Sequence, residues 1–274
     1  MFGIEDYDLL QGINQPVLTW YAPEGRSEFL GPQLAQWIAK TANCLADITG
    51  EDNETSLFIA LPSSWRTLVW WAAATMCGFT PSIGSSVSNR SGVNPHTSNS
   101  SGAHSPTPNS TSAHSPAAQA DSARSEDAYQ YALPQTIKDA DVVVTSSAWQ
   151  AQLITEQAPA TMVLLQALGP LDWSWPGTLP EGSEDAIALV SSQPDALITA
   201  MAGLAEIHVD KTFDRNSPLK PAFLDPEDPN WFSTCTRAWR NHTRPIWVSP
   251  GTDLARAAKQ EGLQPPLHQH YLKP

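Results

Sequence analysis

Three arginines lie close together near residue 240 and form the basic cluster of this sequence: Arg237, Arg240 and Arg244. Arginine binds carboxylates and phosphates through paired hydrogen bonds, so such a cluster could hold a small anion. Lys211 is a further candidate for the same site. The alternative is a helix whose arginines pair with acidic residues such as those at 225–228. The pattern favours this structural role, and Arg237, Arg240 and Lys211 remain the candidate anion-binding residues.

Two other residue types could supply a nucleophile. Ser63 and Ser64 lie between a predicted strand and a predicted helix, a position where serine usually caps the helix. Cys77 falls on the apolar face of that helix, so we expect a buried, unreactive thiol. We therefore predict no catalytic residue in this sequence.

Two short histidine motifs have the spacing of ligands on one face of a strand. They are His208-Val209-Asp210 and His268-Gln269-His270. Neither has a third ligand nearby, and protein zinc sites use three or four. We predict no metal site, and the sequence indicates no cofactor.

The composition excludes several classes of partner. Among 274 residues, 28 are acidic and 15 basic, a net charge of −13, whereas nucleic acids and anionic membranes are bound through basic surfaces. The longest largely apolar run, 68–79, is too short for a membrane span of about 20 residues. The three cysteines, Cys44, Cys77 and Cys235, are widely spaced and odd in number, as expected for reduced thiols. We expect a cytoplasmic protein that binds neither nucleic acid nor membranes.

A low-complexity segment interrupts the chain at 85–126. It is rich in serine and proline and contains no aromatic residue, leucine or isoleucine. Such a segment cannot bury enough apolar surface to offset the entropy lost on ordering, so we predict a disordered linker. Residues 1–84 and 127–274 are predicted to form a single α/β domain around it.

Short apolar runs alternate with amphipathic stretches on both sides of the linker, which indicates an α/β fold with a largely parallel sheet flanked by helices. The apolar run 57–61 has the signature of a strand buried on both faces. Strands are predicted at 16–22, 28–30, 57–61, 79–83, 141–145, 162–165, 186–190, 196–198 and 246–248. Helices are predicted at 32–48, 64–77, 131–138, 147–157 and 253–260, the last capped by Thr252.

Eleven tryptophans are unusual for this length, and Trp65, Trp70 and Trp71 crowd one predicted helix. Two interpretations stay open. The helix is part of the core, or it forms a surface for a homodimer or a protein partner, where tryptophan is enriched.

Several of these stretches together resemble one enzyme family. TWYAPEGRSEFLGPQLAQWIAKTANCLADI resembles the opening of the adenylate-forming superfamily, which includes the acyl-CoA synthetases. LFIALPSSWRTLVWWAAATMCGFTPSI, DADVVVTSS and WVSPGTDLARAAKQEGL resemble later strand and helix units of the same domain. The chain looks like short bacterial proteins that match only the N-terminal part of these enzymes. The resemblance implies the α/β fold of their N-terminal subdomain.

The residues that the resemblance would require for adenylation are missing. The family's phosphate loop is rich in glycine and ends in Pro-Lys, and the equivalent stretch here, 195–204, holds one glycine and no lysine before Lys211. The family's adenine motif is not found, and the sequence ends at Pro274, before the C-terminal catalytic lysine. We expect a truncated, non-catalytic relative with a binding, regulatory or scaffold role. The alternative is an enzyme, or enzyme subunit, that acts on a carboxylic acid or acyl-CoA.

Deleting residues 86–125 should leave the melting temperature nearly unchanged, because closing a long flexible loop costs little more than closing a short one. Thermal unfolding of the full-length and deleted chains would measure the difference. A large drop in melting temperature would show that the segment packs against the rest of the protein.

Overall fold

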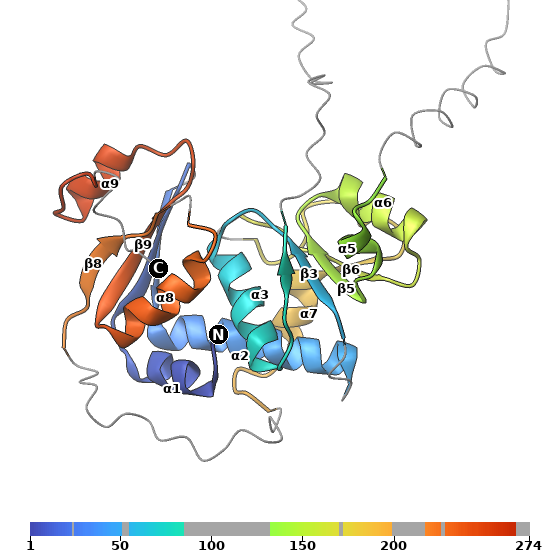
Figure 1. Ribbon diagram of the computed structural model, residues 1–274, viewed down its shortest axis with the longest axis horizontal. Coiled ribbons are helices and arrows are strands. Elements are labelled where there is room, and N and C mark those ends of the chain that lie inside the picture. Colours follow the sequence, from blue (N-terminus) through green and yellow to red (C-terminus); the bar gives the residue numbers. More distant parts are fainter. Residues whose placement is uncertain are drawn as a thin grey trace, which may run out of the picture.

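Two sheets stand on either side of a set of helices in the computed structural model (Figure 1). The structure describes residues 1–23, 25–50, 55–84, 132–169, 172–198, 217–225 and 228–266. The predicted linker at 85–126 lies outside these ranges, as do Lys211 and both histidine motifs. The strands are β1 (Pro16–Ala22), β2 (Gly25–Leu30), β3 (Leu57–Ala60), β4 (Ser82–Ile83), β5 (Val142–Thr145), β6 (Met162–Leu165), β7 (Ser183–Asp185), β8 (Lys220–Phe223) and β9 (Thr243–Val248). The helices are α1 (Ile4–Gly12), α2 (Gly31–Thr49), α3 (Trp65–Met76), α5 (Gln135–Lys138), α6 (Ala148–Gln157), α7 (Ala186–Ser192), α8 (Trp231–Arg240) and α9 (Leu254–Gln260).

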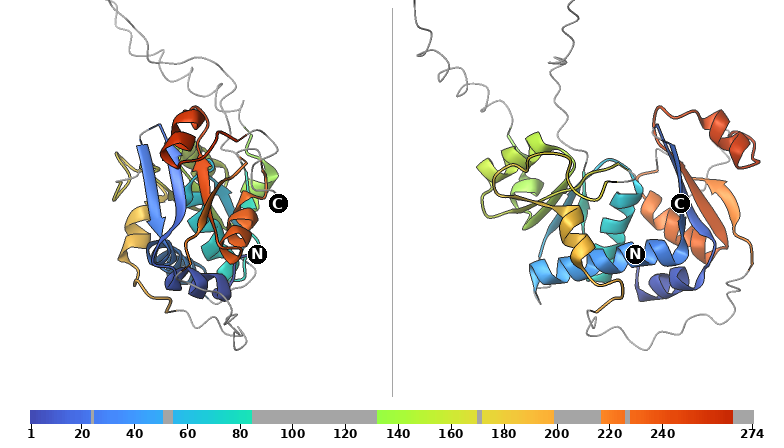
Figure 2. Two further views of the ribbon diagram at one scale, coloured as in Figure 1. Left: turned by 90° about the vertical axis from the view of Figure 1, so that its left-hand side faces the viewer. Right: turned by 180° about the vertical axis from the view of Figure 1, so that it is seen from behind.

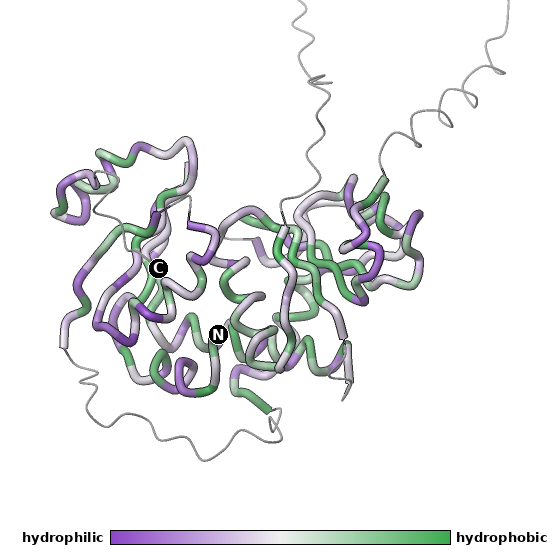
Figure 3. Tube along the Cα trace, viewed as in Figure 1, coloured by the Kyte–Doolittle hydropathy of each residue, from purple (hydrophilic) through white to green (hydrophobic). Residues whose placement is uncertain are grey.

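The larger sheet, sheet B, has five parallel strands in the order β4-β3-β5-β6-β7. Its central strands are buried on both faces, as their unbroken apolar runs predict. Within β3, Phe58 packs with Val143 on one side of the sheet, and Ile59 packs with Val144 on the other. Figure 3 shows the hydrophobic residues concentrated in these strands and in α3. The predicted α/β fold with a largely parallel sheet flanked by helices is confirmed.

The smaller sheet, sheet A, joins the two ends of the described chain. Its order is β2-β1-β9-β8, in which β1 and β2 form an antiparallel hairpin and β9 lies parallel to β1. Figure 2 shows the N-terminal strands and the strands after residue 217 side by side from two further directions. Sheet A is therefore complete only when residues near the C-terminal end pair with β1.

Helix α2 extends from sheet A toward sheet B (Figures 1 and 2) and begins at a glycine for a steric reason. A Cβ atom at Gly31 would lie 2.1 Å from the carbonyl oxygen of Leu10 and 2.5 Å from that of Ile13. The Gly31 N–H donates to the same Ile13 carbonyl at 3.2 Å. The absence of a side chain thus lets the end of α1 approach the start of α2 closely.

The tryptophans of α3 lie in the core, the first of the two predicted alternatives. Trp65 and Trp71 are buried, and Trp70 is only 1% exposed. The Trp70 indole N–H donates to Oε1 of Gln166 at 2.9 Å, so its polar atom is satisfied. A homodimer or protein partner that binds through a tryptophan-rich surface stays a prediction.

The region after β6 differs from the prediction. The run 186–190, predicted as a strand, is helix α7, because Oδ1 of Asp185 accepts hydrogen bonds from the N–H groups of Ile187 and Ala188 and caps a helix. Residues 196–198 form no strand either. A short apolar run fits a buried strand and a short buried helix equally well, and here the cap decides.

Smaller differences concern helix ends and edge elements. No prediction covers α1, β7 or β8; β8 contains Pro221, which weakens a strand signal and is tolerated at this sheet edge. Helix α5 covers only the second half of the predicted stretch 131–138. Asp253, not Thr252, caps α9, through a bond from the Arg256 N–H. Among the described residues, no helix is both long enough and apolar enough to cross a bilayer.

Replacing Trp70 with alanine should lower the free energy of unfolding by about 3–5 kcal/mol, because it opens a cavity in the core and leaves Oε1 of Gln166 without its hydrogen-bond donor. Trp173→Ala is the matched control, because that tryptophan is 76% exposed and its loss should be nearly neutral. Denaturant unfolding measures both. Equal, small effects of the two substitutions would contradict the assignment of Trp70 to the core.

Candidate functional site

The predicted basic cluster is divided between two structural contacts. Arg240, in the last turn of α8, forms a two-point contact with the buried carboxylate of Asp6, at 2.6 and 2.8 Å. Arg237 lies exposed on the same helix, with Thr234 Oγ1 at 3.4 Å. Lys211 lies outside the described residues. An external anion would have to compete with Asp6 for Arg240, so the anion site stays a prediction.

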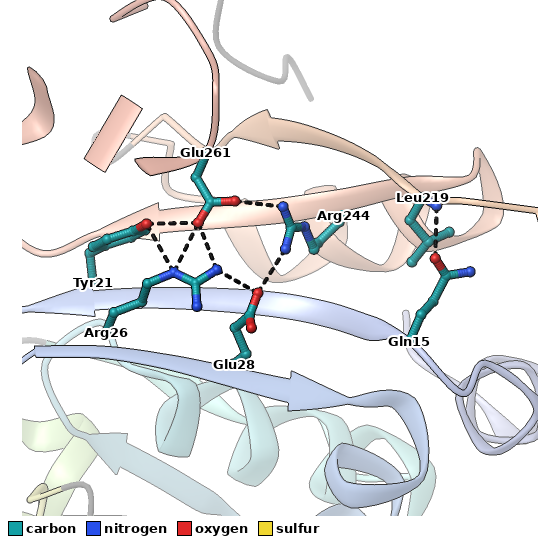
Figure 4. A network of polar contacts seen from close by, with 7 residues as sticks. All are labelled: Gln15, Tyr21, Arg26, Glu28, Leu219, Arg244 and Glu261. Carbon is teal, nitrogen blue, oxygen red and sulfur yellow. Dashed lines mark hydrogen bonds and ion pairs between the residues drawn. The ribbon is translucent and has the colours of Figure 1, made fainter. Parts of the chain in front are cut away.

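Arg244, the third member of the cluster, belongs to a network of charges on sheet A (Figure 4). Its guanidinium donates to Glu28 at 2.9 Å and to Glu261 at 2.6 Å. Glu261 also accepts hydrogen bonds from Tyr21 at 2.7 Å and from Arg26 at 2.9 Å. Each carboxylate is thus paired with arginine, and the network fastens the end of α9 to the strands of sheet A.

These contacts set the protonation of the network. Burial alone would raise the pKa of Glu261, but the hydrogen bonds from Tyr21 and Arg26 and the charges of Arg244 and Arg26 together lower it. Burial and the hydrogen bond to Glu261 raise the pKa of Tyr21 to about 12. At neutral pH neither group is poised to exchange a proton, which favours a structural role.

The candidate nucleophiles also have structural roles. The Ser64 hydroxyl accepts from the Thr67 N–H at 3.2 Å and caps α3, as predicted. Cys77 is half-buried, less than predicted, and burial raises the pKa of its thiol to about 11. Such a thiol is almost wholly protonated at neutral pH and is a poor nucleophile.

A more promising location is the edge of sheet B where its parallel strands end. In open α/β sheets, ligands bind beyond the carboxyl ends of the strands. Trp65 and Arg66 follow the turn that ends β3, and Gly169 and Asp172 follow β6. The topology therefore brings these two segments to one edge.

Arg66 is a buried cation at this edge, only 4% exposed. Its guanidinium donates to the carbonyl oxygens of Gly169 at 3.2 Å and Asp172 at 3.3 Å. No carboxylate of the described residues lies within ion-pair distance, and the Nε atom has no hydrogen-bond partner among them. Burial lowers the pKa of Arg66 to about 10, although the charge of Asp172 opposes the shift.

Aromatic rings surround this arginine and form one wall of an open groove. Its Cζ atom lies 4.4 Å from the centroid of the Trp65 ring, and Trp65 in turn packs against Phe29 at 4.7 Å and Trp37 at 5.8 Å. Phe29, Trp37, Trp65 and the exposed Trp173 line a hollow of about 680 Å³, which we call the aromatic groove. This volume lies within the range of small-molecule sites.

The rest of the aromatic groove is polar. Its polar side chains come from β2, from one face of α2 and from the end of α7: Ser27, Glu28, Gln33, Gln36, Lys40 and Ser191. Lys40 donates to the carbonyl oxygens of Ser191 and Gln193 and pairs with Asp195. Apolar rings beside amides and hydroxyls suit a ligand that has both apolar and polar faces.

No sequence motif predicts this groove, because its residues come from four distant segments. Trp37 is part of a helix pattern, and Trp173 lies in a loop with no motif. The one available signal was Trp65-Arg66 directly after a buried strand, since charged residues at such strand ends commonly face ligands. On its own, this pair indicates only the start of a helix.

The first residues of the stretch 195–204, which corresponds to the phosphate loop by resemblance, contact helix α2. The Asn43 side chain donates to the carbonyl oxygen of Ala196 at 2.9 Å and accepts from the Ile198 N–H at 3.1 Å. Residues 193–198 thus run along α2 without forming a strand. Residues 199–204 lie outside the described ranges.

Comparison with known proteins gives a fold but no sequence family. No family model matches the chain, and no curated protein matches it. ATP-bound MatB from Rhodopseudomonas palustris matches 93% of this chain and 46% of its own, with a TM-score of 0.51 and 12% identity. The amide bond synthetase McbA from Marinactinospora thermotolerans matches 93% of this chain and 45% of its own, with a TM-score of 0.47 and 11% identity. A Brucella canis acyl-CoA synthetase matches 70% of this chain and 27% of its own, with a TM-score of 0.43 and 19% identity.

These neighbours are adenylate-forming enzymes, so the resemblance predicted from the sequence is confirmed for the fold. The chain spans less than half the length of each of the three. The likeness to MatB carries this conclusion, and at 12% identity it concerns the fold alone.

Glu261→Gln should lower the free energy of unfolding by about 1–3 kcal/mol at pH 7, because it removes a buried charge that binds two arginines. The folded-state pKa of Glu261 is below the ordinary value of 4.5, so its stabilising contribution is present above that pH and is lost as the pH falls through the folded-state pKa. Unfolding curves of both proteins at several pH values should therefore converge in acid. Glu181→Gln, at an exposed glutamate, is the control; a pH-independent gap between wild type and Glu261→Gln would contradict the charge-based explanation.

Proposed function

We propose that this chain, which has the fold of part of an adenylate-forming enzyme, is non-catalytic and acts by binding, in a regulatory or scaffold role. The observation that carries the proposal is the stretch 193–204. Its first residues are bound to α2 through Asn43 and form no strand. Its remainder lacks the lysine and all but one of the glycines that an adenylate-forming enzyme needs there.

The chemistry explains why these residues matter. Adenylation requires the β- and γ-phosphates of ATP to be held while a carboxylate attacks the α-phosphorus. Positioning and charge neutralisation supply most of the catalysis of such reactions. Ala, Met and Leu, unlike glycine, rarely adopt the positive φ angles that aim successive N–H groups at phosphate. The net charge of −13 adds repulsion toward a polyanionic nucleotide.

The aromatic groove supports the binding role. It is lined by aromatic rings, and of its described charged groups Glu28 is paired with Arg244, and Lys40 with Asp195 and a backbone carbonyl. Such a surface suits recognition better than proton or phosphoryl transfer, which requires titratable groups in reach of the substrate.

The alternative is an enzyme, or a subunit completed by another chain, that acts on a carboxylic acid or acyl-CoA. The observation that favours it is the match of the fold to a protein solved with ATP bound. Arg66 is buried and has no carboxylate partner among the described residues, so it is the cation that such an activity would first recruit.

A cytoplasmic location is part of the same proposal. All three cysteines are free thiols, and disulfides are the usual state of cysteine in oxidising compartments. Burial raises the pKa of Cys44 to about 12 and that of Cys235 well above its ordinary value, so both are protected from oxidation.

The purified chain should not catalyse carboxylate-dependent ATP–pyrophosphate exchange above a no-enzyme blank. Each lost phosphate contact costs about 3–4 kcal/mol in the transition state, so the loss of several leaves no measurable rate. The assay should use a panel of fatty, aryl and amino acids, with an active adenylate-forming enzyme as positive control. Exchange with any acid would establish the enzymatic alternative, and Arg66→Gln, Arg237→Gln and Arg240→Gln would then test which cation contributes.

A further inference from the structure

We propose that the aromatic groove binds an uncharged saccharide. The proposal rests on the binding role proposed above and names the class of ligand. It follows from three features of the groove: an exposed tryptophan whose backbone is held on both sides, charges that are already paired, and a rim of amides and hydroxyls.

Trp173 is the first feature, because it is a large apolar side chain left 76% exposed on the groove. Exposed apolar rings gathered with others commonly mark a binding surface. Trp37 and Phe29, both half-buried, lie in the same groove. An indole offers a flat apolar face, and a pyranose ring offers a matching face of C–H groups with its hydroxyls at the edge.

The backbone around Trp173 is held on both sides. Before it, Oδ2 of Asp172 accepts from the Gly169 N–H at 2.8 Å, and Arg66 binds the carbonyl oxygens of both residues. After it, the Trp175 N–H donates to Asp185 at 2.6 Å. The backbone that carries the ring therefore has little further freedom to lose on binding, which suits Trp173 to serve as a platform.

The charges in the groove favour an uncharged ligand. Glu28 binds Arg26 and Arg244, and Lys40 binds Asp195 and two carbonyl oxygens. Arg66 is not part of the groove lining; its guanidinium packs on the Trp65 ring and donates to two carbonyl oxygens. A charged ligand would lose hydration without gaining a free counter-charge, which is unfavourable.

The polar rim fits hydroxyl groups. Amides and hydroxyls both donate and accept hydrogen bonds, as sugar hydroxyls do. Gln33 accepts from the Leu30 N–H through Oε1, which leaves its NH₂ group for a ligand. Ser27 and Ser191 add hydroxyls from two other elements. A purely aromatic ligand would stack equally well but would leave these groups without partners, at a cost in affinity.

The test is titration of the full-length chain with glucose, maltose, cellobiose and N-acetylglucosamine, followed by tryptophan fluorescence and by calorimetry. We expect saturable binding of at least one sugar. Trp173→Ala should weaken it at least about tenfold, which corresponds to 1.4 kcal/mol. Trp149→Ala is the matched control, because Trp149 is 40% exposed but lies on α6, outside the groove.

Three results would overturn the proposal: no sugar binds, the two tryptophan variants lose affinity equally, or only planar aromatic probes such as indole and phenol bind. The exchange assay separates this outcome from the failure of the proposed function. Sugar binding with ATP–pyrophosphate exchange would overturn the non-catalytic role alone. If neither sugar binding nor exchange is observed, only the proposed ligand class is overturned.

Discussion

The parallel pairing of β1 with β9 is the interaction on which the arrangement of the two sheets depends. Thr19, Trp20 and Tyr21 of β1 pair with Ile246, Trp247 and Val248 of β9. On one face of this pair the rings of Trp20 and Trp247 stack at 5.4 Å, almost parallel. Trp231 of α8 packs on Trp247 at 4.8 Å, and Phe232 continues the contact to Trp71 of α3. A row of aromatic rings therefore connects sheet A to the helix that follows β3.

This connection also explains how the groove is formed. Strand β2 pairs with β1, so the position of β1 determines where Phe29 and Glu28 lie relative to α2. The network around Glu261 then attaches α9 and β9 to the same hairpin through Arg26, Arg244 and Tyr21. One side of the groove is thus held by sheet A, and the other by the Arg66 contacts at the edge of sheet B.

Local patterns in the sequence predict most of the elements, because each is decided by neighbouring residues. The buried runs at 57–61 and 141–145, the Ser64 cap and the helix over 32–48 all depend on apolar spacing or on one side chain. Helix α7 was predicted as a strand because its apolar run is ambiguous until the Asp185 cap is recognised. The groove could not be predicted in this way. It depends on contacts between residues far apart in sequence, such as Arg66 with Asp172, which carry no local signature.

The pairing of β1 with β9 has a consequence for the newly made chain. The indole of Trp239 donates to the Val17 carbonyl at 2.7 Å across 222 residues of sequence. At the usual synthesis rate of about 5–20 residues per second, β1 leaves the ribosome roughly 10–45 s before this partner exists. Throughout that interval one edge of the β1–β2 hairpin and the face of Trp20 are unpaired, as in an aggregation-prone edge strand. Sheet B is contained within residues 57–185 and can form in the meantime. The nascent chain therefore passes through a stage in which the unpaired edge of β1 and the face of Trp20 are the surfaces that a chaperone would cover.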